Sequence, residues 1–240
     1  MENKKEMTAL DVSAATDTEQ PISKCTDNSI SEKAGKINDL ETISMTELYD
    51  TVYPSKPPLI DGLLYTGTYL FVGAPKLGKS YLMAQLAYHI STGTPLWDYT
   101  VRKGTVLYLF FSVSADSLGN GLDAQLQRFM QEHTDTSLII IDTLQKVREV
   151  GGDNYSYAND YEIITRLKQF ADKYGICILL VHHTRKQTAD DKFNMISGTT
   201  GLLGAADGAF LLQKEKRTSN AATLEVSGRD QQDQRVYLKK

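Results

Sequence analysis

One eight-residue stretch constrains the fold of this chain more than any other: Gly73-Ala-Pro-Lys-Leu-Gly-Lys-Ser80. It fits the pattern G-x-x-x-x-G-K-[ST], a glycine-rich turn that leads from a strand into a helix. The residues before it, GTYLFV at 67–72, are β-branched and aromatic, as a buried strand would be. The residues after it, 81–90, place apolar side chains on one helical face. Because both flanks are correct, a chance glycine-rich turn is the weaker interpretation.

This strand, loop and helix setting predicts a phosphate-binding site. Successive backbone N–H groups and the positive end of the helix dipole would point at one anion. We expect Lys79 to reach the β- and γ-phosphates of a nucleotide and the Ser80 hydroxyl to ligate Mg²⁺. The pattern assigns the whole loop to cofactor binding, namely Gly73, Ala74, Pro75, Lys76, Leu77, Gly78, Lys79 and Ser80.

The composition indicates a soluble protein with one α/β domain and tails, since 41% of its 240 residues are hydrophobic and 23% are charged. A net charge of -4 gives no global attraction to nucleic acid, so such binding would need local basic loops. The two cysteines, Cys25 and Cys177, form neither a disulfide framework nor a metal site. We expect a cytoplasmic protein without a membrane span, because no signal peptide and no apolar run near 18 residues is present.

The chain divides into a polar tail, 1–44, which we expect to be disordered, and one domain, 45–240. Apolar runs alternate with helical patterns along the domain, which predicts an α/β fold with a mostly parallel sheet and helices on both faces. The run 105–113 is continuously apolar and predicts a strand buried on both faces. The segment 59–64 could pack beside a nucleotide base, although ordinary core packing is favoured.

Two other predicted strands end in polar residues. Residues 137–142 end in Asp142, and 176–181 lead into His182 and His183. Ligands of such sheets lie beyond the carboxyl ends of the strands, so we expect Asp142 to share Mg²⁺ with Ser80. The alternative for Asp142 is a cap for the turn that follows. One histidine could contact the γ-phosphate and act catalytically, and the alternative is a histidine satisfied within the core.

The loops after these two strands are basic and could contact nucleic acid. Lysine and arginine pair with phosphates, and nearby tyrosines can stack on bases, which suits single-stranded DNA. A solvated charged loop is the alternative, because Asp190 and Asp191 offset part of the charge. The candidate DNA contacts are Lys146, Arg148, Arg185 and Lys186.

Four segments together resemble one family of ATPases. GAPKLGKS, LIIIDTL, LLVHHTRK and ISGTTGLLGAADGAFLL occur in the order found in the RepA-like hexameric replicative helicases of plasmids and mobile elements, which are RecA-type P-loop NTPases. The resemblance covers about 59–240. It implies a RecA-type core, ATP and Mg²⁺ as cofactors, a ring of identical subunits, and single-stranded DNA in the central channel. It also implies that Lys79 and Asp142 act in catalysis with His182 or His183 as a sensor.

One departure from this family concerns hydrolysis. In such ATPases the strand after the first helix usually ends in a glutamate that activates the attacking water. This chain has no glutamate between Glu47 and Glu132, as though a strand end, a helix and a loop had been deleted around 106–114. Asp116 is the nearest carboxylate, but a helix start or turn role is favoured for it.

Two functions therefore stay open: a helicase-like ATPase, or a shortened binding module that holds ATP and DNA without turnover. The chain also ends at Lys240, where the resemblance predicts further strands, so we expect a shortened C-terminus. A ring ATPase needs a basic residue from the neighbouring subunit. The sequence does not choose among the candidates Lys214, Lys216, Arg217 and Arg229.

Overall fold

The computed structural model describes residues 42–52, 56–110, 121–147, 157–184, 193, 196, 200–216, 219–229 and 231–239. The chain divides into two units, Met1–Val52 and Tyr53–Lys240. In the first unit the described part is helix α1 (Met45–Asp50), which begins with a capping box. The Ser44 hydroxyl accepts the Glu47 N–H, and the Glu47 carboxylate accepts the Ser44 N–H. Residues 1–41 of the predicted tail lie outside the described residues.

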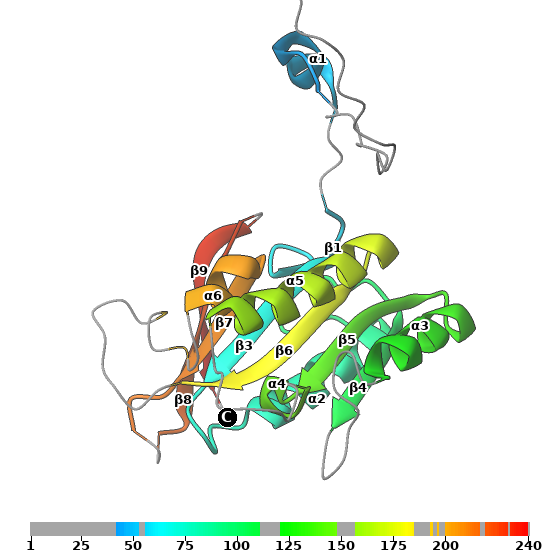
Figure 1. Ribbon diagram of the computed structural model, residues 1–240. Helices are drawn as coiled ribbons and strands as arrows, with labels where there is room; N and C mark the ends of the chain where they lie inside the picture. The colour runs from blue at the N-terminus through cyan, green and yellow to red at the C-terminus, as the bar shows by residue number, and fades with distance from the viewer. Residues whose placement is uncertain are drawn as a thin grey trace, which may run out of the picture. The chain divides into compact units, whose positions relative to one another are not determined.

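The second unit is built on a central sheet whose described part has seven strands (Figure 1). Their order across the sheet is β4 (Thr105–Phe110), β5 (Thr136–Asp142), β6 (Cys177–His183), β3 (Gly67–Gly73), β7 (Gly208–Gln213), β8 (Ala221–Gly228) and β9 (Gln231–Lys239). Neighbours from β4 to β7 are parallel, whereas β8 pairs antiparallel with β7 on one side and with β9 on the other. The predicted mostly parallel sheet is confirmed. A separate hairpin pairs β1 (Pro58–Ile60) with β2 (Leu64–Tyr65).

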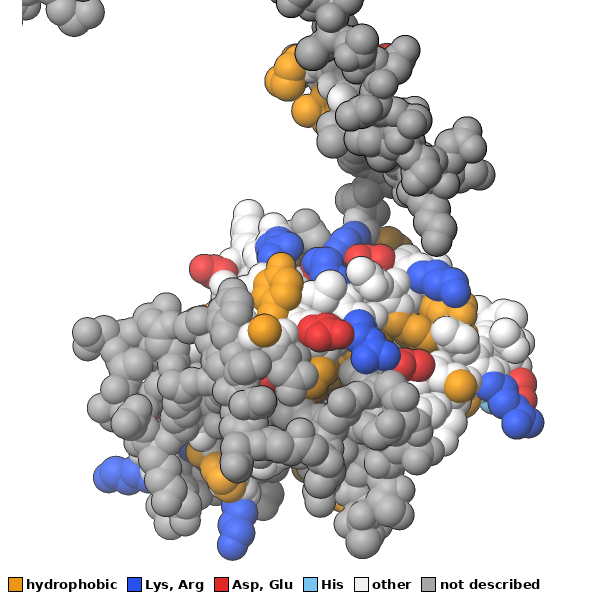
Figure 2. Space-filling view, viewed as in Figure 1, with side chains coloured by type: hydrophobic (Ala, Val, Ile, Leu, Met, Phe, Trp, Pro, Cys, Tyr) orange, Lys and Arg blue, Asp and Glu red, His pale blue; other side chains and the backbone are white. Residues whose placement is uncertain are grey.

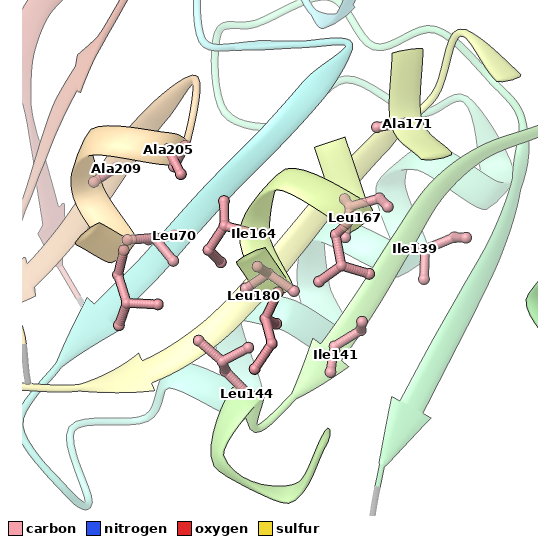
Figure 3. Packing of buried hydrophobic residues seen from close by; sticks show 14 of the residues in the cluster. Leu70, Ile139, Ile141, Leu144, Ile164, Leu167, Ala171, Leu180, Ala205 and Ala209 are labelled. Atoms are coloured by element: carbon pink, nitrogen blue, oxygen red, sulfur yellow. The ribbon is translucent and has the colours of Figure 1, made fainter. Parts of the chain in front are cut away.

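Helices cover both faces of this sheet, as predicted. Alternate strand residues point to opposite faces, which separates the buried side chains into two apolar layers. One layer packs against α3 (Leu122–Glu132), α5 (Tyr157–Tyr174) and α6 (Thr200–Ala205), with the short α4 (Leu144–Val147) at its end. In Figure 3 Leu70, Ile141 and Leu180 of this layer project from the strands on the face that carries α5. The other layer packs against α2 (Lys79–Thr92) and the β1–β2 hairpin.

Strand β4 differs from its prediction. It is half-buried rather than buried on both faces, and Phe110 at its end is 69% exposed. The reason is its place in the sheet, since among the described residues β4 pairs with β5 alone. An edge strand has a neighbour on one side only, so its side chains are less covered. Residues 111–120, which include the end of the predicted run, lie outside the described residues.

Two further segments contribute to the core, and for the segment 59–64 the favoured interpretation is confirmed. Helix α6 occupies Thr200–Ala205, a stretch rich in glycine and threonine. Its Leu202 and Ala205 are buried in the core, so packing outweighs the low helix propensity of glycine and threonine. The segment 59–64 is core packing, because Leu59, Ile60, Leu63 and Leu64 are at most 2% exposed in the layer under α2.

A buried carboxylate, Asp207, fixes the amino end of β3. It accepts the Thr68 N–H at 2.9 Å and the Lys56 ammonium at 3.2 Å, and the Lys168 ammonium also donates to it. Burial alone would raise the pKa of Asp207, but these hydrogen bonds and charges outweigh burial and hold it below its usual value. Gly67 must be glycine here, since its φ is 132° and a Cβ would lie 2.8 Å from Asp207 Oδ2.

Candidate functional site

The loop between β3 and α2 has the backbone of an anion cradle. Lys76 and Gly78 both have positive φ, 64° and 94°, so the chain turns sharply before α2 begins at Lys79. Gly78 caps the helix without a side-chain hydrogen bond. The first backbone N–H groups of α2 therefore have no side-chain cap and are suited to an anion. Gly73 packs closely on β7, where a Cβ would lie 2.8 Å from the Leu212 carbonyl oxygen.

Lys79 is the buried cation of this loop, only 6% exposed. Its ammonium donates to the carbonyl oxygens of Gly73 at 2.8 Å and Ala74 at 3.1 Å. It also lies 3.2 Å from Nδ1 of His183. Burial lowers the pKa of Lys79, and the negative charge of Asp142 partly opposes that effect. The lysine is thus a desolvated cation in contact with neutral dipoles.

Ser80, Asp142 and Tyr108 meet beside this lysine. The Ser80 hydroxyl donates to Oδ2 of Asp142 at 2.5 Å, and the Tyr108 hydroxyl donates to the same oxygen at 3.0 Å. Burial, followed by the charge of Asp142, raises the pKa of Tyr108 well above its usual range. Its hydroxyl therefore stays protonated and serves as a donor. Sequence reasoning missed Tyr108, because its contact depends on how β4 aligns with β5.

The two histidines at the end of β6 lie on opposite faces. Register pairs His182 with Val72 and His183 with Gly73, and successive strand residues alternate in direction. His183 contacts Lys79, whereas His182 is buried at 3% exposure. Burial and then the charge of Lys79 lower the pKa of His183, against the opposing effect of Asp142. A neutral His183 can accept a hydrogen bond from Lys79 at Nδ1.

The predicted DNA contacts cannot be placed beside this site. The Lys146 side chain, Arg148, Arg185 and Lys186 lie outside the described residues. Figure 2, which views the face covered by α5, shows Lys and Arg side chains interspersed with Asp and Glu. Among the candidates for a basic residue acting on a neighbour, Arg229 donates to the Gly204 carbonyl oxygen at 2.9 Å. Lys214 lines the cleft described next, Lys216 is exposed, and Arg217 lies outside the described residues.

An open cleft of about 650 Å³ adjoins the loop on the side of β7, β8 and β9. It lies between the loop and a wall where Arg235 pairs with Glu225 at 2.7 Å and Tyr237 is 75% exposed. Sequence reasoning missed it because its residues come from five separate segments. They are Ala74, Pro75, Leu77, Thr184, Gln213, Lys214, Glu215, Thr223, Glu225, Arg235 and Tyr237.

A glycine-rich loop after the central strand, its lysine, and a serine–aspartate pair on neighbouring elements define the class of P-loop nucleotide-binding folds. The chain belongs to the AAA domain family, whose model matches residues 36–119 and 110–189. The two matched stretches overlap at residues 110–119. No curated protein matches the chain.

Among solved structures the chain is similar to one described as an ATPase domain, with a TM-score of 0.54 and 12% identity. The likeness covers 72% of this chain and 81% of that one. At this identity it shows a shared fold, and the RecA-type α/β core expected from the sequence is confirmed. In the described part of the chain no helix is long and apolar enough to cross a membrane.

Proposed function

We propose that this chain is a P-loop ATPase domain that binds ATP with Mg²⁺ and acts in a helicase-like motor. The observation that carries the proposal is the assembly around Lys79. Its ammonium lies within 3.1 Å of the carbonyl oxygens of Gly73 and Ala74 at the mouth of the loop, and Ser80 bonds Asp142 at 2.5 Å beside it. A buried cation, uncapped helix amides and a hydroxyl–carboxylate pair are complementary to a magnesium triphosphate.

The side chains present fit a magnesium ion shared with a nucleotide. Ser80 Oγ and the Asp142 carboxylate would supply hard oxygen ligands, and such sites use one or two protein oxygens together with phosphates. Within the described residues, no group of three or more His, Cys, Asp and Glu could hold a metal ion. When bound, Mg²⁺ would neutralise charge that develops on the phosphate oxygens during transfer.

The residues of the loop would change partners when ATP binds. Lys79 would leave the Gly73 and Ala74 carbonyl oxygens and donate to the β- and γ-phosphates, because a charged acceptor forms the stronger hydrogen bond. His183 would lose its contact with Lys79 in the same step. We therefore assign the sensor role to His183 and keep His182 as a core residue.

The cleft beside the loop would take the base and ribose. It opens between the loop and the β8–β9 hairpin, and Tyr237 offers an exposed ring against which a base can stack. Arg235 and Glu225 provide polar groups at the same wall. The nucleotide would thus contact β3, α2 and the antiparallel strands together.

The finer assignments follow from the family resemblance. We propose a cytoplasmic homo-oligomeric ring that acts on single-stranded DNA during plasmid or mobile-element replication. Lys146, Arg148, Arg185 and Lys186 would contact the DNA. These residues lie in segments that follow β5 and β6, the strands whose ends carry Asp142 and His183. Nucleotide and DNA would therefore bind at the same edge of the sheet.

A second candidate function is a nucleotide- and DNA-binding module that does not hydrolyse ATP. The observation that favours it is the chemistry of β4, which carries Tyr108 and Phe110 beside Asp142 and no glutamate. A general base is typically worth about 100- to 10,000-fold in rate, so hydrolysis without one would be slow.

Both functions are tested on one preparation of the full chain. ATP binding is measured by calorimetry, and steady-state hydrolysis is measured with and without single-stranded DNA. Binding with turnover raised by DNA supports the motor, and binding without turnover supports the module. Lys79→Met should abolish both signals, and a wild-type chain that fails to bind ATP would overturn the proposal. If Arg185→Ala with Lys186→Ala leaves DNA affinity unchanged, that loop is not the contact.

A further inference from the structure

We propose that Tyr108 is a positioning residue of the nucleotide site, which holds the Asp142 carboxylate against Ser80 and thereby sets the affinity for the magnesium form of the nucleotide. This inference rests on the proposed function and deepens it. It assigns a role to a side chain that neither the phosphate-loop pattern nor the aspartate at the end of β5 indicates.

The sheet brings Tyr108 to the carboxylate. In the register of β4 and β5, Tyr108 lies opposite Ile140 and Phe110 lies opposite Asp142. Tyr108 and Asp142 are therefore diagonal neighbours on the same face, a separation that a long aromatic side chain can span. The tyrosine reaches inward from β4, at one side of the described sheet, to the edge where β3, β5 and β6 end.

The hydrogen bonds specify what the hydroxyl does there. The Tyr108 hydroxyl lies 3.0 Å from Oδ2 of Asp142 and 3.4 Å from the Ser80 carbonyl oxygen. Because a phenol has one proton, the shorter contact to the charged acceptor takes it. Ser80 donates to that same Oδ2 at 2.5 Å. Two donors from different elements thus converge on one carboxylate oxygen and restrict how the group can turn.

Such support matters for metal affinity. Partners that hydrogen-bond a ligating carboxylate fix its orientation, and their removal typically costs about 10- to 100-fold in metal affinity or activity. The Ser80 hydroxyl can ligate the ion through a lone pair and still donate its proton to Asp142, but one hydrogen bond leaves the carboxylate free to turn about it. The Tyr108 bond comes from outside the set of ligands and would supply the second restraint.

A purely structural role makes a different prediction. The Tyr108 ring packs in the apolar layer under α2, and its centroid lies 6.2 Å from that of Phe110. Tyr108→Phe keeps this ring and removes only the hydroxyl. Tyr99→Phe is the matched control, because the Tyr99 hydroxyl contacts Gln234 at 3.4 Å, and neither residue belongs to the proposed site.

The experiment measures the affinity of the full chain for a fluorescent ATP analogue across a Mg²⁺ titration, with a parallel series in EDTA and a thermal melt of each variant. We expect Tyr108→Phe to raise the Mg²⁺ concentration for half-maximal binding about 10-fold. Its affinity in EDTA should match wild type, its melting temperature should stay close to that of wild type, and Tyr99→Phe should behave as wild type throughout.

Three results would overturn the inference. An unchanged Mg²⁺ requirement in Tyr108→Phe removes the positioning role and leaves nucleotide binding intact. An equal loss of affinity with and without Mg²⁺ assigns Tyr108 a structural role. A wild-type chain that binds no nucleotide in either series overturns the proposed function, and the role of Tyr108 falls with it.

Discussion

Two buried charges lie at opposite ends of β3, and their surroundings differ. At the carboxyl end, the Lys79 ammonium contacts two carbonyl oxygens and an imidazole nitrogen, and burial lowers its pKa. At the amino end, Asp207 contacts two ammonium groups and a backbone N–H, and its pKa lies below its usual value despite burial. Burial thus disfavours the charged form of Lys79. The partners of Asp207, in contrast, stabilise its charged form.

The difference separates a structural charge from a functional one. Asp207 has counter-charges from the segment before β1 and from α5, so its ion pairs are complete within the fold. Lys79 has contacts with neutral dipoles, and an anion of the size of a phosphate would improve its surroundings. Both pKa values are lowered, which disfavours the charged form of Lys79 and favours the charged form of Asp207.

The largest expected effect is on stability at the Asp207 end. Asp207→Ala should lower the free energy of unfolding by about 3–5 kcal/mol, because it leaves two ammonium groups and the Thr68 N–H without their acceptor. Chemical denaturation measures this loss. Asp172→Ala is the control, since that exposed carboxylate lies 4.0 Å from the same Lys56 and should cost less than about 1 kcal/mol. Equal losses in both variants would contradict a special role for burial.

The next effect is on binding at the Lys79 end. Lys79→Met removes the charge and keeps most of the volume, so ATP affinity should fall at least about 100-fold, since hydrogen bonds between charged groups are worth about 1.5–3 kcal/mol each. Calorimetry measures the affinity, and Lys103→Ala, an exposed lysine before β4, should bind as wild type. The thermal melt should change little. A large loss of stability in Lys79→Met would show that Lys79, like Asp207, has a structural role.

The Asp207 end should also respond to acid. The pKa of Asp207 lies below its usual value of 3.8, so its contribution is fully present above that pH and is lost as pH falls through the folded-state pKa. The stability difference between wild type and Asp207→Asn should be constant from about pH 7 to pH 5 and shrink below about pH 4. Denaturation curves over this range measure it. A difference that grows on acidification would contradict the sign.

The smallest expected effect concerns the cleft. Tyr237→Ala should weaken ATP binding about 5-fold, since stacking of aromatic groups contributes about 1 kcal/mol. Tyr88→Ala, an exposed tyrosine on α2 that does not line the cleft, is the control. The same assay with inorganic triphosphate should show no difference between Tyr237→Ala and wild type. If both ligands lose affinity equally, the tyrosine does not contact the base.

The sequence predicted the features that depend on local patterns. The phosphate loop, the strand ending in Asp142 and the alternation of strands and helices are each specified within a few adjacent residues, and all are present in the fold. The sequence does not show which of His182 and His183 faces Lys79, because that depends on which side of the sheet each side chain of β6 points to. Sequence reasoning identified both histidines as candidates for the sensor and did not choose between them.

The features that sequence reasoning missed depend on contacts between distant segments. Tyr108 reaches Asp142 only through the β4–β5 register, and the cleft joins the phosphate loop to strands near the end of the chain. The burial of β4 was predicted wrongly because an apolar run indicates a strand but not its place in the sheet. The sequence of α6 gives little indication of a helix, because packing and not propensity stabilises it.

The order of strands has a consequence for local motion. The amides of β3 are bonded on both sides, by β6 and β7, so their exchange with solvent hydrogen requires opening of the whole domain. Strand β4 is held by β5 alone among the described residues, and its amides should exchange through smaller, more frequent openings. Each such opening would withdraw Tyr108 from Asp142 while the phosphate loop keeps its shape. The protein would therefore release the metal ion and the nucleotide on different timescales.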